Sequence, residues 1–205
     1  MAINQNLSEF EVRTIREGIR RKYAEVAQAG TGCCFRYPTG EEGLTKLGYP
    51  PELLQGIPDP VLASFCGVGN PFSLGPINPG ETVLDIGCGA GVDTLMAALL
   101  VGPTGRVVGI DATAEMIARA QANLALTGLA NVSFAVASAE TLPFPDGEFE
   151  VALSNGVFNL LIDKEQALSE AYRVLKPGSR LMLADMVLVQ ELPKEQAAKV
   201  ENWFQ

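Results

Sequence analysis

The residues with the clearest chemical potential are three alternating glycines that follow a short apolar run. Gly87, Gly89 and Gly91 come directly after residues 82–86, and a second apolar run ends at Asp111, about 20 residues beyond the glycines. Glycine lets the backbone turn tightly and approach a ligand where a Cβ would intrude. An acid at the end of the second strand accepts hydrogen bonds from ribose hydroxyls. The pattern predicts a cleft for an adenosine-containing cofactor; the alternative is an ordinary glycine turn with a solvated acid.

A further acid helps to choose the cofactor. Asp85 stands near the end of the first apolar run, and the glycines are spaced GxGxG, whereas dinucleotide-binding loops read GxGxxG. A carboxylate there would repel a pyrophosphate on the following helix, but it would attract an ammonium and a sulfonium group. S-adenosylmethionine carries both cations and is therefore the favoured cofactor, with NAD as the alternative.

Apolar segments of strand and helix type alternate through the second half of the chain. This alternation predicts an α/β fold with a doubly wound, mostly parallel sheet. The expected strands are 82–86, 107–110, 132–136, 150–154 and 180–184, and the expected helices are 92–101, 114–126 and 164–175. Ligands in such folds bind at the carboxyl ends of the strands. That edge carries Asp85, Asp111, Ser138, Ala139, Glu140, Asn155 and Asp185.

The first 80 residues differ in character from the rest. Ser8 and Glu11 have the spacing of a capping box. Apolar residues then recur at helical spacing until Gly30, namely Phe10, Ile15, Ile19, Tyr23 and Val26. Asp59 and Pro60 suit the N-cap and first position of a short helix. We therefore expect an N-terminal helical extension, residues 1–80, and a cofactor-binding unit, residues 81–205, with the Gly/Pro-rich passage between them serving as a linker or as part of a lid.

Composition narrows the classes of function. The chain of 205 residues has a net charge of -9 and no histidine. A basic surface for nucleic acid or anionic membrane is not expected, and imidazole catalysis is excluded. The first residues lack the features of a signal peptide, and no apolar run has the length of a membrane span. We therefore expect a cytoplasmic protein with a small-molecule partner and unpaired cysteines.

These segments resemble the class I S-adenosylmethionine-dependent methyltransferases, and among them the arsenite methyltransferase family. The first resemblance depends on LDIGCGAG, VVGID, ASAETLPFPDGEFEVALSN and EAYRVLKPGSRLML. The second depends on the adjacent Cys33 and Cys34 and on LGYPPELL, GNPFSL, VGPTGRVVGIDAT and SNGVFNLLIDKEQAL. The resemblance implies a Rossmann-like methyltransferase fold in which the family's last, antiparallel strands would lie beyond Gln205. The uncovered edge strand would suit a homodimer or the N-terminal helix.

The resemblance also implies cofactor contacts. Asp85, Gly87 and Gly89 would hold the methionine moiety, with Asn155 beside its end. The remaining implied residues are Asp111 and Ala112 at the ribose and adenine, Ala139 and Glu140 at the adenine edge, and Met116 on the adenine ring. Cys88 and Gly91 belong to the same glycine loop. For Met116 the alternative is ordinary helix core, and for Cys88 it is a small residue that fits the loop.

The implied metalloid ligands are Cys33, Cys34 and Cys66, because trivalent arsenic prefers thiolates. The family usually carries two more cysteines, where this sequence has Val68 and Gly156. An alternative to a ligand role for Cys33 and Cys34 is a structural one, in which they are small buried apolar residues. No metal cofactor is required.

Three functions therefore compete. The first is arsenite methylation, in which the arsenic lone pair needs no general base. The second is methylation of another small molecule, for which Glu140 or Asp185 could act as base or serve only as strand-end or cofactor groups. The third is binding of S-adenosylmethionine or metalloid without catalysis.

Overall fold

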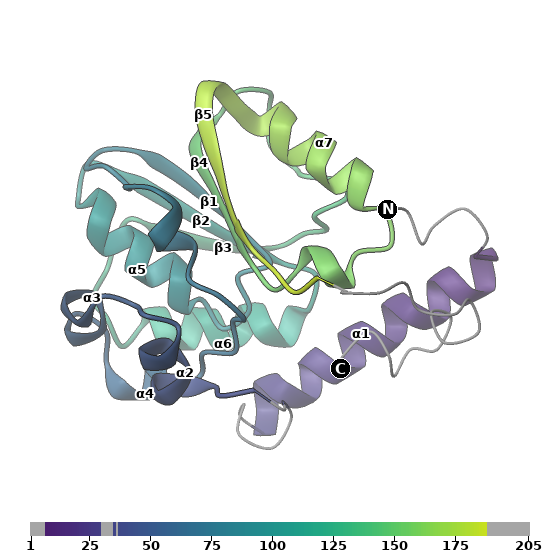
Figure 1. Ribbon diagram of the computed structural model, residues 1–205, viewed down its shortest axis with the longest axis horizontal. Coiled ribbons are helices and arrows are strands. Elements are labelled where there is room, and N and C mark those ends of the chain that lie inside the picture. The colour runs from purple at the N-terminus through teal and green to yellow at the C-terminus, as the bar shows by residue number, and fades with distance from the viewer. Residues whose placement is uncertain (1–6, 30–34, 36, 188–205) are drawn as a thin grey trace.

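A computed structural model of the chain describes residues 7–29, 35 and 37–187. Its centre is a parallel sheet of five strands in the order β3-β2-β1-β4-β5 (Figure 1). The strands are β1 (Thr82–Ile86), β2 (Arg106–Asp111), β3 (Val132–Val136), β4 (Phe149–Asn155) and β5 (Leu175–Ala184). β1 is the central strand, since Leu84 pairs with Val108 of β2 on one side and with Ala152 of β4 on the other. This is the predicted doubly wound α/β sheet, and it directs every strand's carboxyl end to one edge.

Helices cover both faces of the sheet, which explains why successive side chains of β1, β2 and β4 are buried without alternation. Helices α5 (Val92–Val101) and α6 (Ala114–Leu124) lie on one face and α7 (Lys164–Val174) lies on the other (Figure 1). Val83 of β1 packs in the cluster that contains residues of α5, whereas Leu84 and Ile86 pack in the cluster that contains residues of α7. The sheet is therefore the middle of three layers.

The junction between α7 and β5 differs from the sequence prediction. The sequence predicts a strand only from residue 180, after a helix that ends at 175, but β5 already begins at Leu175, which pairs with Phe149 of β4. The pairing register then shifts before Val151, and Gly178 has a positive φ of 81°. The turn-forming residues are therefore accommodated as an irregularity within the strand.

Short helices precede the sheet. These are α2 (Gly40–Lys46), α3 (Pro51–Gln55), α4 (Asp59–Leu62) and the 3₁₀ helix η3 (Pro71–Leu74); a second 3₁₀ helix, η4 (Phe158–Leu160), follows β4. Our prediction for Asp59 was wrong by one position: Pro58 is the N-cap of α4, and it makes no side-chain capping bond. The helix already begins at Asp59, and Pro58 has the extended φ and ψ that suit an N-cap.

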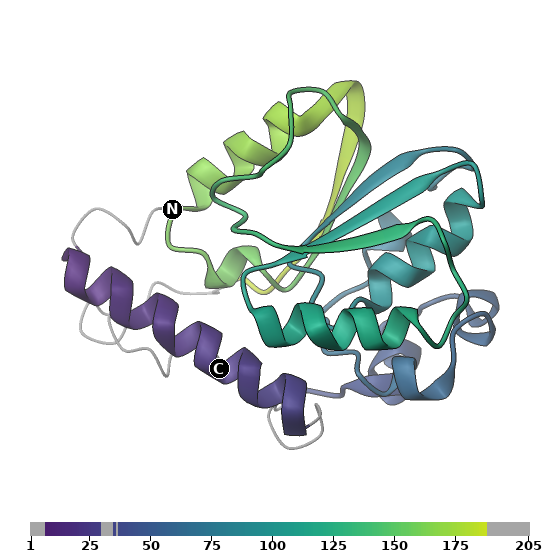
Figure 2. The same cartoon turned by 180° about the vertical axis from the view of Figure 1, so that it is seen from behind.

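The N-terminal helix α1 (Glu9–Ala29) lies beside α6, beyond the carboxyl ends of the strands (Figures 1 and 2). The capping box is confirmed, because the Ser8 amide donates to Glu11 and the Glu11 amide donates to the Ser8 hydroxyl. Ile15 and Val26 are buried, but Phe10 is 67% exposed, so its predicted place on the apolar face was wrong. Phe10 lies in the first turn, next to the polar cap. Of the helices in the described ranges, none is long and apolar enough to cross a membrane.

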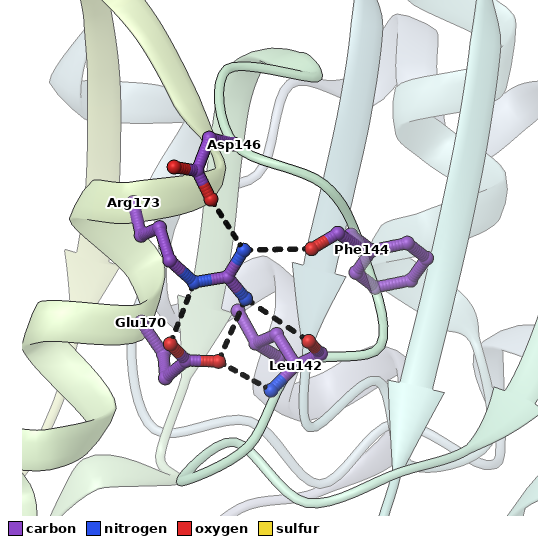
Figure 3. Close-up of polar contacts among 5 residues, drawn as sticks. All are labelled: Leu142, Phe144, Asp146, Glu170 and Arg173. Carbon is purple, nitrogen blue, oxygen red and sulfur yellow. Dashed lines mark hydrogen bonds and ion pairs between the residues drawn. The ribbon is translucent and has the colours of Figure 1, made fainter.

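The connection from β3 to β4 is held by one arginine rather than by a helix. Arg173 of α7 makes ion pairs with Glu170 and Asp146 and donates to the carbonyl oxygens of Leu142 and Phe144 (Figure 3). Glu170 in turn accepts a hydrogen bond from the Leu142 amide. This cluster anchors the loop that leaves the functional edge of the sheet.

Candidate active site

A cavity lies at the carboxyl ends of the strands, where the sequence predicts the ligand. It contains about 1200 Å³ of empty space, part of it open to solvent. Its walls include the predicted residues Asp85, Gly87, Cys88, Gly89, Asp111, Ala112, Ala139, Glu140, Asn155 and Cys66.

The three glycines of the loop are required for different reasons. Gly87 has a φ of 76°, and a Cβ there would lie 2.2 Å from a methyl group of Val157. Gly91 has a φ of 86°, and a Cβ there would lie 2.8 Å from the ring of Phe134. Gly89 has a φ of 51°, and its Cβ would meet no atom of the described residues within 4 Å. Gly89 therefore leaves open a space on the cavity wall that fits the close approach of a ligand.

Asp111 ties the end of β2 to the glycine loop. Its carboxylate accepts hydrogen bonds from the Gly89 amide at 3.0 Å and from the Thr113 amide at 2.8 Å. Burial raises the pKa of Asp111, and these two amides oppose that rise. The carboxylate thus lies on the cavity wall in the position that suits ribose hydroxyls, because each of its oxygens has a further acceptor site.

Two buried carboxylates lie close together beneath the loop. Burial, together with the neighbouring Asp93, raises the pKa of Asp85 to about 8, although the Thr94 hydroxyl donates to it at 2.6 Å. Burial likewise raises the pKa of Asp93 to about 6. Both carboxylates line the cavity, so a cationic ligand would relieve their mutual repulsion. Sequence reasoning missed Asp93, whose only signal is an acid in the first turn of the helix after the glycines.

Glu140 is already engaged by the N-terminal helix. One carboxylate oxygen forms an ion pair with Arg16 at 2.5 Å, and the other accepts a hydrogen bond from the Asp163 amide at 3.0 Å. Arg16 and Tyr23 of α1 both line the cavity. No spacing rule predicts the contribution of Arg16, because its partner Glu140 lies 124 residues further along the chain.

Three residues that the sequence analysis placed at the site do not line the cavity. Met116 is 1% exposed and does not line the cavity. Gly91 is turned toward Phe134, behind the wall. The contacts of Met116 and Gly91 with a cofactor therefore stay predictions. Asp185, named above as a base for an oxygen nucleophile, also lies off the wall, and it accepts hydrogen bonds from the Asn159 and Met186 amides.

The cysteines have distinct environments. Cys66 is half-buried on the cavity wall, and burial raises the pKa of its thiol to about 12. Cys88 is buried in the glycine loop, and burial raises its pKa well above the ordinary value. Cys33 and Cys34 lie outside the described residues. Within the described ranges, no group of three or more histidine, cysteine or acidic side chains is arranged to hold a metal ion.

The two positions where arsenite methyltransferases usually carry cysteine lie against each other. A Cβ built at Gly156 would be 3.2 Å from both methyl groups of Val68. Gly156 lines the cavity and has a φ of 73°. The two departures from the family pattern therefore lie at one place in the structure.

A parallel sheet with a glycine loop after β1, an acid ending β2 and a cavity at the strands' carboxyl ends is the architecture of the class I S-adenosylmethionine-dependent methyltransferases. The family described as "Methyltransferase domain" matches residues 77–205, and the chain belongs to this family. Its cofactor is S-adenosylmethionine, and the open face at Gly89 and the carboxylates Asp85 and Asp111 fit that group.

Curated relatives narrow the resemblance. The chain is 36% identical over 193 residues to an arsenite methyltransferase of Halobacterium salinarum, covering 88% of this chain and 49% of that protein. It is 35% identical over 195 residues to an arsenite methyltransferase of Aquipseudomonas alcaligenes, covering 88% and 53%. A ubiquinone/menaquinone biosynthesis C-methyltransferase of Enterobacter sp. is 42% identical over 111 residues, covering 53% and 44%. The chain thus spans about half the length of the curated relatives it matches.

Solved structures agree with the fold. An arsenic(III) S-adenosylmethionine methyltransferase from Chlamydomonas reinhardtii superposes with a TM-score of 0.64 at 35% identity, covering 71% of this chain and 52% of that one. A methyltransferase from Aquifex aeolicus gives a TM-score of 0.53 at 27% identity, covering 74% and 77%. The predicted fold class is confirmed.

Proposed function

We propose that this protein transfers a methyl group from S-adenosylmethionine to trivalent arsenic bound by cysteine thiols. The observation that carries the proposal is the position of Cys66, which lines the same cavity as the glycine loop and Asp111. The similarity to two arsenite methyltransferases over 88% of the chain supports the same acceptor.

The chain's own residues would hold the cofactor and exclude water. Asp85 and Asp93 would face the ammonium and sulfonium charges, Asp111 would accept the ribose hydroxyls, and Gly89 would allow close approach of the backbone. The sulfonium supplies an activated methyl group. Ile19 and Tyr23 of α1 and Leu160 also form part of the cavity wall. Such a wall keeps the acceptor and the methyl carbon aligned and excludes competing water.

Arsenite capture would need no base in the protein. The high pKa of Cys66 keeps its thiol protonated at neutral pH. When the As–S bond forms, an As–O bond breaks, and the thiol proton leaves with the hydroxyl group as water. Cys33 and Cys34 would supply the other thiols, as thiolate-rich ligation of a soft centre requires. The arsenic lone pair then attacks without losing a proton.

A second candidate is methyl transfer to another small acceptor. The contact between Val68 and Gly156 favours it, because two positions that hold thiols in the arsenite methyltransferases are apolar here. The similarity to a C-methyltransferase over half of the chain is consistent with a carbon acceptor.

The two candidates are separated by a cysteine variant. Cys33→Ser combined with Cys34→Ser should abolish arsenite binding while S-adenosylhomocysteine binds as in the unaltered protein. Calorimetric titration with each ligand measures both affinities. Unchanged arsenite affinity would refute the thiol assignment, and loss of both affinities together would make the pair structural. A protein that binds the cofactor product but never arsenite would favour the second candidate.

A further inference from the structure

Asn155 at the end of β4 is bonded to the chain segment that carries Cys66. Its side-chain oxygen accepts hydrogen bonds from the Val68 amide at 2.8 Å and from the Gly69 amide at 3.0 Å. Its side-chain nitrogen lies 2.9 Å from the Gly69 carbonyl oxygen. One carboxamide therefore binds both amides and a carbonyl of a segment more than eighty residues earlier in the chain.

The same carboxamide also contacts the start of α5, next to the glycine loop. Its nitrogen also lies 2.9 Å from the Asp93 carboxylate and 3.0 Å from the Tyr49 oxygen. The Tyr49 hydroxyl donates to Asp93 at 2.8 Å, with the Gly69 carbonyl as a second acceptor at 3.1 Å. Asp93 lies in the first turn of α5, directly after the glycine loop. The network thus joins the cofactor loop to the Cys66 segment.

Packing leaves the segment little freedom to lie elsewhere. A Cβ at Gly67 would be 2.3 Å from the Asn155 nitrogen, and a Cβ at Gly69 would be 2.6 Å from the Ala184 methyl carbon. Two glycines therefore let the backbone press against the ends of β4 and β5. The hydrogen bonds of Asn155 and the close packing of Gly67 and Gly69 therefore favour the same backbone path for this segment.

We propose that Asn155 is a positioning residue which, through Asp93 and Tyr49, holds the segment from Cys66 to Gly69 at a fixed distance from the cofactor loop. This inference rests on the proposed function in one respect only: the reaction is methyl transfer within this cavity. In-line transfer demands close control of the distance between acceptor and methyl carbon. The carboxamide of Asn155 has its oxygen and nitrogen committed to protein partners, and this favours positioning over the direct cofactor contact that the family resemblance implies.

The test is the variant Asn155→Asp in the full-length chain. It keeps the size of the side chain but removes the donor to Asp93 and places two carboxylates together. We measure the rate at which N-ethylmaleimide modifies Cys66, followed on the Cys66 peptide by mass spectrometry, and the affinity for S-adenosylhomocysteine. We expect modification at least about tenfold faster, the factor that corresponds to losing one hydrogen bond to a charged group. The ligand affinity is measured in parallel as a separate readout, because Asn155 also lines the cavity.

Two further variants complete the test. Tyr49→Phe keeps the buried ring and removes only the hydroxyl, so it carries the test should Asn155→Asp fail to fold, and it should also accelerate modification of Cys66. Asn131→Ala is the matched control, since Asn131 donates to two carbonyl oxygens, those of Ala98 and Gly102, at the other end of the sheet. It should leave the Cys66 rate unchanged.

Two results would overturn the inference. One is a large loss of S-adenosylhomocysteine affinity with an unchanged Cys66 rate, which would make Asn155 a cofactor ligand. The other is equal acceleration in Asn155→Asp and Asn131→Ala, which would show a general loss of stability. The modification rate reports the position of the segment whatever the acceptor, so a protein that fails to methylate arsenite would refute the proposed acceptor alone.

Discussion

The buried carboxylate Asp85 makes cofactor binding depend on pH. Burial and the neighbouring Asp93 raise the pKa of Asp85 to about 8, so the ligand-free carboxyl is mostly protonated at neutral pH and below. A cationic ammonium group is held by the ionised form, so binding below pH 8 must release a proton. The same linkage acts on folding. Between the ordinary Asp pKa and 8 the folded chain holds a proton that the unfolded chain has lost, and the ligand-free protein loses stability as pH rises through this range.

The size of the effect follows from the titration of Asp85. Binding needs the ionised form of this carboxyl group, whose pKa is about 8, whereas the ligand amine, which is the α-amine of a free amino acid, stays mostly protonated from pH 6 to pH 8. With other groups held fixed, the dissociation constant of S-adenosylhomocysteine should be about 50-fold larger at pH 6 than at pH 8.

Isothermal titration calorimetry in buffers of different ionisation enthalpy measures both the affinity and the proton released. At pH 6 the observed enthalpy should vary with the buffer as expected for about one released proton per ligand. The control Asp85→Asn cannot release that proton, so its affinity should be weak and should change much less between pH 6 and pH 8 than the affinity of the unaltered protein. An unaltered protein whose affinity is flat over this range, with no proton release, would refute the pairing of Asp85 with the ligand amine.

Four further substitutions test the remaining structure. Gly87→Ala should lower both the melting temperature and the affinity for S-adenosylhomocysteine, because its Cβ would clash with Val157. Gly89→Ala should reduce the affinity with a smaller loss of stability. Equal melting temperatures in the two variants would contradict this expectation. Asp111→Asn should weaken S-adenosylhomocysteine by about tenfold or more, as loss of a charged acceptor implies, and calorimetry with unchanged affinity would disprove it. Arg173→Ala should lower the melting temperature while ligand affinity is kept, since its partners lie in the loop before β4; an unchanged thermal scan would argue against the anchoring role.

Local patterns predicted the parts of the site that depend on neighbouring residues. The glycine loop, Asp85 and Asp111 follow from an apolar strand, the glycine spacing and the position of an acid, all of which are read within about thirty residues. The sheet followed from the alternation of strands and helices. These features are encoded locally, so a single sequence suffices to find them.

The missing parts depend on contacts between distant segments. Arg16 meets Glu140, and Asn155 meets Val68 and Asp93, only after the chain has folded. No spacing rule connects residues so far apart. The irregular start of β5 was missed for a related reason, since KPGS is typical of a turn and only the pairing with β4 draws it into a strand.

The most direct test of the central claim is turnover by the purified protein with S-adenosylmethionine, arsenite and a monothiol, followed by mass detection of methylated arsenic. The proposed function predicts methylated arsenic formed in proportion to S-adenosylhomocysteine, with product lost in Cys66→Ser. Tight binding of S-adenosylhomocysteine without any methylated arsenic would contradict arsenic as the acceptor and would support the second candidate or a protein that only binds.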